Sequence, residues 1–218
     1  MNCLTLHLMN KIKFNILLSS FILISACGVK IEQLVEDHSS NYSITEVFDN
    51  SQNELVFDMN ITFNKNQNSG ILAVVRDSLD KRKYRTVFMA KAGIKLFDFS
   101  LSNENLVINH IIPALDKKIV KNILEKDLRL AFDPIGKSTF SSYKVKEGEQ
   151  VVLRTKKSKK YYHYFLNQRS KISKVVKGNK KKSVVEMTIS YKENQEVSKI
   201  FIDHKRMPFS ISLSSLSL

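Results

Sequence analysis

The sequence has little of what marks a disulfide-bonded or loop-dominated protein. Among 218 residues it has two cysteines, three prolines and six glycines, and it has no tryptophan. Two cysteines cannot form a disulfide framework, and the low glycine and proline content excludes a collagen-like chain. A hydrophobic content of 43% is too high for a disordered chain. The length suits a single domain with its own core.

Familiar catalytic motifs are also missing. We find no GxSxG, HExxH, P-loop, GxGxxG or CxxC pattern. The histidines after residue 27 are His38, His110, His163 and His204, and no two have the spacing of metal ligands. Asp203 and His204 are adjacent, so on a strand they point to opposite faces. We therefore predict no enzyme activity, no cofactor and no metal site, although a hydrolase assembled from distant residues stays open.

Residues 10–27 have the three parts of a secretory signal. Lys11 and Lys13 precede an apolar run over residues 14–24, which at 11 residues is shorter than the roughly 20 that span a bilayer. Four residues that resemble a bacterial lipobox follow: Ile24, Ser25, Ala26 and Cys27. A plain signal peptide with a chance cysteine, or a short buried helix, is the alternative. Met9 is an alternative start of the chain.

The lipobox predicts three regions. Residues 1–26 form the signal peptide, residues 27–41 a lipidated tether or short helix, and residues 42–218 the folded domain. Acyl chains on Cys27 would hold the mature protein to a membrane. Gly28, rather than Asp, follows the cysteine, which in Gram-negative bacteria resembles sorting to the outer membrane. Such a location in the cell envelope excludes chromosomal DNA as a partner.

Alternating apolar and polar residues predict a mainly β domain. In the clearest segment Leu55, Phe57, Met59, Ile61 and Phe63 share one face. Asn68-Ser69-Gly70 reads as the turn that follows it. About eleven strands are expected: 55–63, 71–77, 84–91, 94–101, 106–112, 150–155, 160–167, 171–177, 183–191, 197–203 and 209–213.

One segment between these strands has a helical period instead. Apolar residues between 115 and 128 recur along one stripe, which predicts a helix over residues 116–131. Asp116 is the expected N-cap, and Pro134 ends the segment.

One helix cannot cover eleven strands, so the antiparallel sheet should curl into an unclosed barrel with the helix as a lid. The concave face would then hold acyl chains or be filled by side chains, and the sequence leaves both open. Candidate cavity residues are Phe57, Met59, Ile61, Phe63, Tyr84 and Phe88. Candidate lid residues are Ile119, Ile123, Leu124 and Leu128.

The order of lipobox, strands, helix and returning strands resembles the LolA/LolB superfamily of bacterial lipoprotein carriers and receptors. Residues 127–134, DLRLAFDP, are similar to a DLxLA…P segment of LolB-like families, and residues 207–213, MPFSISL, are similar to their closing strand. The resemblance implies an unclosed barrel with a helical lid that binds lipid or lipoprotein acyl chains. It also implies a role in lipoprotein transport rather than catalysis.

The net charge of +14 is concentrated in one part of the chain. Residues 144–182 carry fourteen basic side chains and only two acidic ones. The lysines gather in two clusters: Lys156, Lys157, Lys159 and Lys160, and then Lys180, Lys181 and Lys182. These clusters predict a surface for anionic lipid or an acidic protein partner. Hairpin tips and edges protected from aggregation by lysine are the alternative.

Overall fold

The structure is a computed structural model, and it describes residues 34–36, 42, 44, 45, 47, 48, 52–80, 82–102, 105–135, 139–145, 150–179 and 182–216. Within the described residues a series of strands is interrupted by one helix, which lies between β6 and β7 in the chain. The strands are β1 (Leu34–Glu36), β2 (Glu54–Phe63), β3 (Asn66–Arg76), β4 (Tyr84–Ala90), β5 (Lys95–Ser102), β6 (Asn105–Ile111), β7 (Ser141–Val145), β8 (Val151–Lys157), β9 (Lys160–Leu166), β10 (Ile172–Gly178), β11 (Ser183–Tyr191), β12 (Val197–His204) and β13 (Phe209–Ser215). The helix is α2 (Lys118–Phe132).

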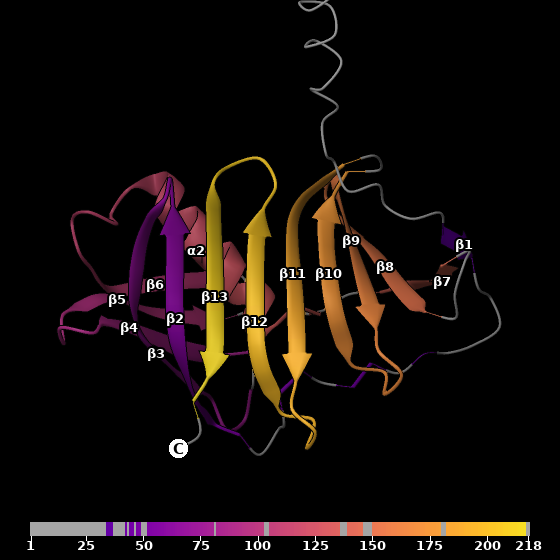
Figure 1. The fold of residues 1–218 in the computed structure, drawn as a ribbon, viewed down its shortest axis with the longest axis horizontal. Coiled ribbons are helices and arrows are strands. Elements are labelled where there is room, and N and C mark those ends of the chain that lie inside the picture. The colour runs from indigo at the N-terminus through magenta and orange to yellow at the C-terminus, as the bar shows by residue number, and fades with distance from the viewer. Residues whose placement is uncertain are drawn as a thin grey trace, which may run out of the picture.

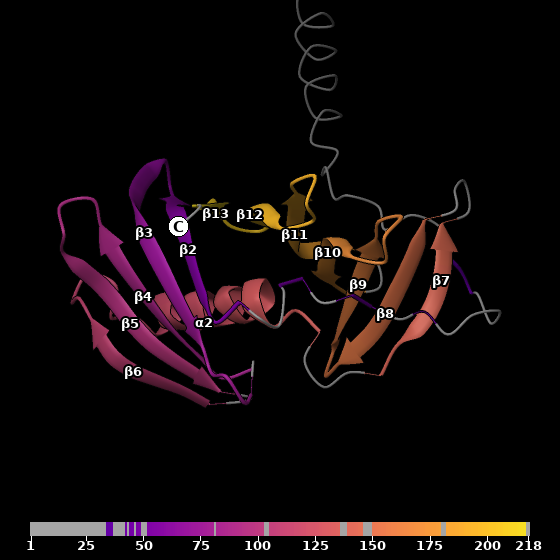
Figure 2. The same ribbon diagram turned by 90° about the horizontal axis from the view of Figure 1, so that it is seen from below.

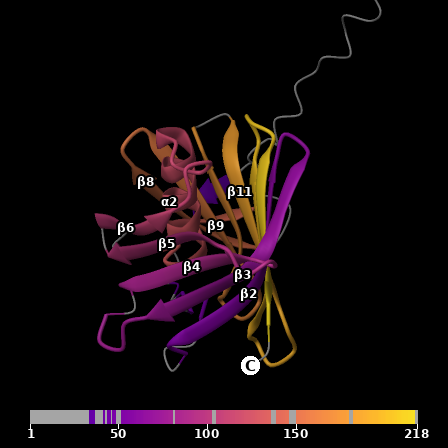
Figure 3. The same cartoon turned by 90° about the vertical axis from the view of Figure 1, so that its left-hand side faces the viewer.

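The strands form one sheet in the order β1-β7-β8-β9-β10-β11-β12-β13-β2-β3-β4-β5-β6, and every paired neighbour is antiparallel. Strands β1 and β6 are its two edges, so the sheet does not close. Figures 1 and 2 show that it curves, and that α2 lies on the inner side of the curve. The view from the side in Figure 3 shows the wing of β2–β6 turning away from the strands behind it. This confirms the predicted unclosed barrel with a helical lid.

The alternation of β2 decides which face is buried. Leu55, Phe57, Met59 and Ile61 are at most 9% exposed, and the residues between them are partly exposed. The apolar faces of β2–β5, β9–β13 and α2 contribute to a single hydrophobic core on the concave side. Each fully buried apolar side chain contributes about 1.5–3 kcal/mol.

The turn between β2 and β3 lies earlier than expected. It consists of Asn64 and Lys65, both with positive φ, as a two-residue hairpin turn requires. The expected turn at residues 68–70 is wrong, because these residues belong to β3. Gly70 is needed there for another reason: a Cβ at this position would collide with the backbone carbonyl of Met89 on β4.

The helix is close to the predicted range but begins differently. It spans Lys118–Phe132 rather than residues 116–131, and its N-cap is Lys117, without a side-chain hydrogen bond. The prediction that Asp116 is the N-cap is therefore wrong, since its carboxylate instead accepts a hydrogen bond from Lys121 Nζ. The helix ends before Pro134, as expected.

The structure describes thirteen strands instead of about eleven. The additional ones are the edge strand β1 and its neighbour β7, which pair with each other. Leu34–Glu36 is thus a strand within a segment expected to be a tether or helix. Short edge strands carry too few residues for periodicity to be read from sequence alone.

Candidate functional site

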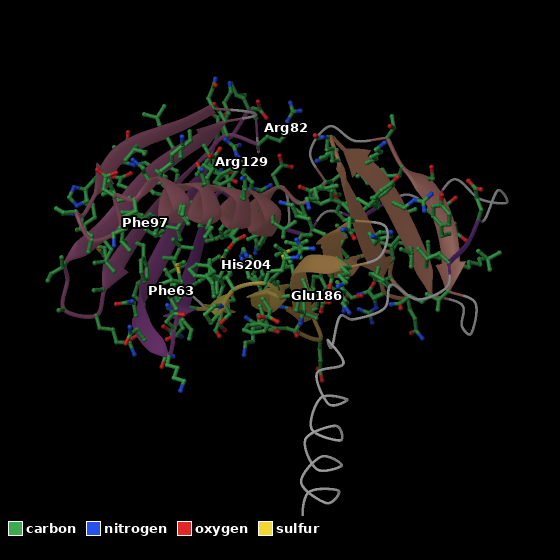
Figure 4. The ribbon with its side chains drawn as sticks, turned by 90° about the horizontal axis from the view of Figure 1, so that it is seen from above. Phe63, Arg82, Phe97, Arg129, Glu186 and His204 are labelled. Atoms are coloured by element: carbon green, nitrogen blue, oxygen red, sulfur yellow. The ribbon has the colours of Figure 1, made fainter. Side chains whose placement is uncertain are left out.

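The concave face brings most of the predicted cavity residues together. Met59 and Phe88 are fully buried, Phe57 and Tyr84 are nearly so, and Ile61 is 8% exposed. All five belong to the core that also includes α2. Phe63 does not, because it lies at the end of β2, is 49% exposed and packs beside Phe209 at a ring distance of 6.3 Å. Figure 4 shows Phe63 at the hairpin end of β2.

The four predicted lid residues on α2 differ in how far they are buried against this face. Leu124 and Leu128 are buried against the sheet, and Ile123 is partly buried. Ile119, in the first turn, is 71% exposed. Of the four predicted lid residues, the structure therefore brings three to the core.

The C-terminal end of α2 sits in an aromatic cluster. The ring of Phe132 lies 5.6 Å from Phe48, 5.7 Å from Phe57 and 5.9 Å from Tyr84. Aromatic pairs at these separations each add about 0.5–1.5 kcal/mol beyond the apolar area that they bury. This cluster fixes the end of the helix on the concave face.

Three polar side-chain contacts connect the helix region to three separate parts of the sheet. Asp127 Oδ2 lies 2.8 Å from His204 Nε2 on β12. Arg129 donates to the backbone oxygen of Asn105 on β6 at 2.8 Å. The Tyr164 hydroxyl on β9 donates to the carbonyl oxygen of Pro134, just after the helix, at 2.8 Å. The helix is thus held across the width of the concave face.

The Asp127–His204 pair is buried. The side chain of Asp127 is 3% exposed and that of His204 is 9% exposed. Burial raises the pKa of Asp127 above its usual value, and the hydrogen bond and charge of His204, with Lys177 and Lys126, partly oppose this rise. His204 also packs edge-on against Phe209 at 5.2 Å. Figure 4 shows His204 beside the helix.

Our sequence reading missed this pair, because the two residues are 77 positions apart. One signal was available. Asp127 falls on the apolar stripe of the helix, between Leu124 and Ala131, where a carboxylate needs a buried partner. The sequence does not indicate which residue that partner is.

A buried tyrosine hydroxyl lies near the same end of the helix. Tyr84 is 4% exposed, and within the described residues its hydroxyl has no hydrogen-bond partner. Burial raises the pKa of Tyr84, and the nearby Arg129 opposes that shift. The hydroxyl is a polar group within an apolar face, and it could bond to a polar atom of a ligand.

The first lysine cluster and Lys182, the described member of the second, lie at the same end of the sheet. Strands β8 and β9 meet at a hairpin where Lys157 pairs with Lys160, and Gly178 at the end of β10 pairs with Tyr161. Both hairpin tips therefore lie at the same end of the sheet. Of the predicted basic residues, Lys156, Lys157, Lys159 and Lys182 are exposed and Lys160 is partly buried. Lys180 and Lys181 lie outside the described residues.

The predicted lipobox of Ile24, Ser25, Ala26 and Cys27 also lies outside the described residues. Across the ranges that the structure does describe, His, Cys, Asp and Glu side chains form no group of three or more that could hold a metal ion. In those same ranges no helix has both the length and the apolar character to cross a bilayer.

One comparison with a known structure supports the fold. A solved domain from Vibrio parahaemolyticus, named for outer membrane lipoprotein sorting, matches with a TM-score of 0.51 and 11% identity, covering 75% of this chain and 83% of that one. A DUF1329 family protein from Desulfovibrio piger matches with a TM-score of 0.48 and 7% identity, covering 76% and 84%. No family model and no curated protein matches significantly. The chain therefore shares the fold of the domain from Vibrio parahaemolyticus.

Proposed function

We propose that this protein is a non-enzymatic lipoprotein of the cell envelope that binds acyl chains and takes part in lipoprotein or lipid transfer. In this proposal Cys27 carries the lipid that anchors the chain, and the outer membrane is its location. The acyl chains lie between α2 and the concave face of the sheet. The similarity to a domain named for outer membrane lipoprotein sorting supports this role.

One observation carries the proposal: a single amphipathic helix covers the apolar inner face of a wide, unclosed sheet. Leu124 and Leu128 of α2 share one core with Leu72 on β3 and Ile200 on β12. The inner face buries apolar side chains from strands on both wings, and α2 is the only helix within the described residues. If the helix moves outward, it exposes a continuous apolar surface that acyl chains can cover.

A second candidate is a structural or adaptor lipoprotein with a filled core. The ring of Phe132 packs against those of Phe48, Phe57 and Tyr84, which favours this candidate at that end of the helix. Such a protein would present its basic surface to an envelope partner and would take up no lipid.

Native mass spectrometry of the full chain, together with uptake of a fluorescent acyl probe, separates the two candidates. We expect lipid to co-purify and the probe to gain fluorescence on binding. Leu128→Gln places a polar group on the inner side of α2 and should reduce uptake strongly, whereas Ile119→Gln, at a position 71% exposed, should not. Circular dichroism confirms that both variants are folded. A folded chain with neither bound lipid nor probe uptake contradicts acyl binding and leaves the adaptor role.

Anchoring is tested separately. Cells grown with labelled palmitate should label the wild-type chain, and Cys27→Ser should abolish both the label and recovery in the membrane fraction. Labelling that persists in Cys27→Ser would show that the anchor is elsewhere.

A further inference from the structure

The two hairpin tips at one end of β8–β11 place six lysines together. The tip between β8 and β9 and the tip between β10 and β11 are adjacent, because Gly178 pairs with both Tyr161 and Ser183. We call this group the lysine-rich end. It consists of Lys156, Lys157, Lys159, Lys160, Lys177 and Lys182.

Little acidic charge balances these lysines. Residues 150–179 contain nine basic residues and no aspartate or glutamate. Asp133 is near enough to Lys157 to oppose the lowering of its pKa by burial, but it forms no ion pair with it. Elsewhere lysines are paired directly, as Lys205 is with Asp203 at 2.7 Å. Within the described part of the chain, none of the six lysines has such a partner. Lys157 Nζ donates to the carbonyl oxygen of Ile135 at 3.4 Å. Burial raises the pKa of Asp127, and Lys177 is near enough to Asp127 to oppose that rise. The charge most available to an external anion is therefore that of Lys156, Lys159, Lys160 and Lys182.

Tyrosine rings lie directly behind these ammonium groups. Lys156 Nζ is 5.9 Å from the ring centre of Tyr161, and Lys157 and Lys177 lie 5.5 and 5.2 Å from that of Tyr162. Tyrosine and lysine together suit the polar surface of a bilayer, because each combines an apolar body with a polar end. Lysine, unlike arginine, acts as a hydrated point charge without a fixed binding geometry. The composition therefore fits a diffuse anionic surface better than one shaped ligand.

The described chain begins at β1, which lies on the same half of the sheet as the lysine-rich end. Leu34 pairs with Val145 and Lys144 with Val151, so β1 begins at the opposite end of the strands from the two lysine-bearing tips. Strand β1 begins at Leu34, seven residues after Cys27, and seven residues span at most about 25 Å. Along the sheet, β1 is four strand spacings from β10, about 19 Å, but twelve from β6. An anchor at Cys27 thus keeps this half of the sheet, rather than the lysine-bearing tips themselves, near the membrane.

We propose that the lysine-rich end docks on the surface of an anionic phospholipid bilayer and orients the anchored domain. Each lysine near such a surface strengthens the attraction severalfold, so a subset of the six is sufficient. Docking fixes which side of the domain faces the membrane while α2 and the concave face remain free for ligand. The anchor part of this argument rests on the proposed lipidation of Cys27.

Tryptophan fluorescence tests the proposal, because the natural sequence contains no tryptophan. Tyr161→Trp reports on the lysine-rich end, and Phe201→Trp, 40% exposed on β12, reports on a distant site. The full chain is reconstituted into phosphatidylcholine vesicles with and without about 30% phosphatidylglycerol. In the anionic vesicles we expect the fluorescence of Tyr161→Trp, but not that of Phe201→Trp, to shift to shorter wavelength and to be quenched by brominated lipid. Salt should reverse both effects.

A matched pair of charge variants, each made in the Tyr161→Trp background, completes the experiment. Lys156→Gln/Lys159→Gln/Lys160→Gln should lower the salt concentration that reverses the fluorescence signal by about twofold. Lys65→Gln/Lys91→Gln/Lys199→Gln removes the same charge from exposed positions elsewhere and should leave that concentration unchanged. The two charge variants should take up the acyl probe equally. A chain that shows the fluorescence changes on anionic vesicles but takes up no acyl probe contradicts the proposed function and leaves the docking standing.

Three outcomes overturn docking. One is no fluorescence change of Tyr161→Trp in either vesicle type, and the second is an equal change in both. The third is a salt-reversible change with poly-glutamate but none with anionic vesicles, which would assign the surface to an acidic protein.

Discussion

Asp127 on α2 and His204 on β12 are joined at 2.8 Å between Oδ2 and Nε2, and both side chains are almost fully buried. The contact connects the covering helix to the centre of the sheet. A buried carboxylate that loses its partner keeps its desolvation cost, so each half of the pair depends on the other.

The first prediction concerns pH. Because burial raises the pKa of Asp127 above its usual 3.8, the folded state binds a proton more tightly than the unfolded state does. Protonation of Asp127 therefore contributes to the stability of the folded state. This contribution is complete below about pH 3.8 and is lost as the pH rises through the pKa that Asp127 has in the folded state. Asp127→Asn removes this titration and keeps an acceptor for His204. Urea unfolding at a series of pH values should show wild-type stability falling relative to the variant as pH rises. A constant difference would contradict the prediction.

The second prediction concerns Asp98 on β5, whose side chain is 2% exposed and which pairs with Arg85 at 2.6 Å. Hydrogen bonds from Arg85 and then Asn109 lower the pKa of Asp98 to about 2, although its burial acts in the opposite direction. Its contribution is therefore present above pH 3.8 and is lost as pH falls towards about 2. Asp98→Asn should destabilise the protein by about 1–3 kcal/mol at pH 7, since hydrogen bonds to a charged group are lost. Unfolding curves should converge near pH 2. A difference that persists there would indicate packing rather than charge.

The third prediction concerns the aromatic cluster. Phe132→Ala leaves a cavity among Phe48, Phe57 and Tyr84 and should cost about 3–5 kcal/mol in the free energy of unfolding. Leu79→Ala, at a position 97% exposed, should change it by less than about 0.5 kcal/mol. Denaturant unfolding measures both. A Phe132→Ala cost below that of Leu79→Ala would show that the helix end does not depend on this packing.

The fourth prediction compares two glycines. Gly70→Ala places a methyl group against the Met89 carbonyl, so β3 and β4 must separate and the domain should lose stability by several kcal/mol. Gly93→Ala meets open space and suffers only from its φ of 79°, which costs about 1–2 kcal/mol. In thermal unfolding, Gly93→Ala should therefore have a higher midpoint temperature than Gly70→Ala. The reverse order would show that the positive φ at Gly93 costs more stability than the contact of residue 70 with the Met89 carbonyl.

Much of this fold could be predicted from periodicity. The alternation from Leu55 to Ile61 identified a strand and its buried face, and the stripe through Leu124 and Leu128 identified the helix. Boundaries were less certain, as the turn at Asn64 shows. There an asparagine and a lysine with positive φ form the turn that we expected at residues 68–70. Gly70 serves close packing between strands, and only the register of β3 against β4 reveals this.

The sequence alone determined the class of fold, the concentration of charge in residues 144–182 and the candidate acylated cysteine. These properties depend on local composition and on periods of two or 3.6 residues, which are visible along the chain. The tertiary structure decided three others: the pairing of Asp127 with His204, the exposure of Phe63 and Ile119, and the placement of Lys182 at the same end of the sheet as the first lysine cluster. Each depends on strand register and on which face the helix presents. Contacts between residues far apart in sequence fix both, so neither can be read from one segment alone.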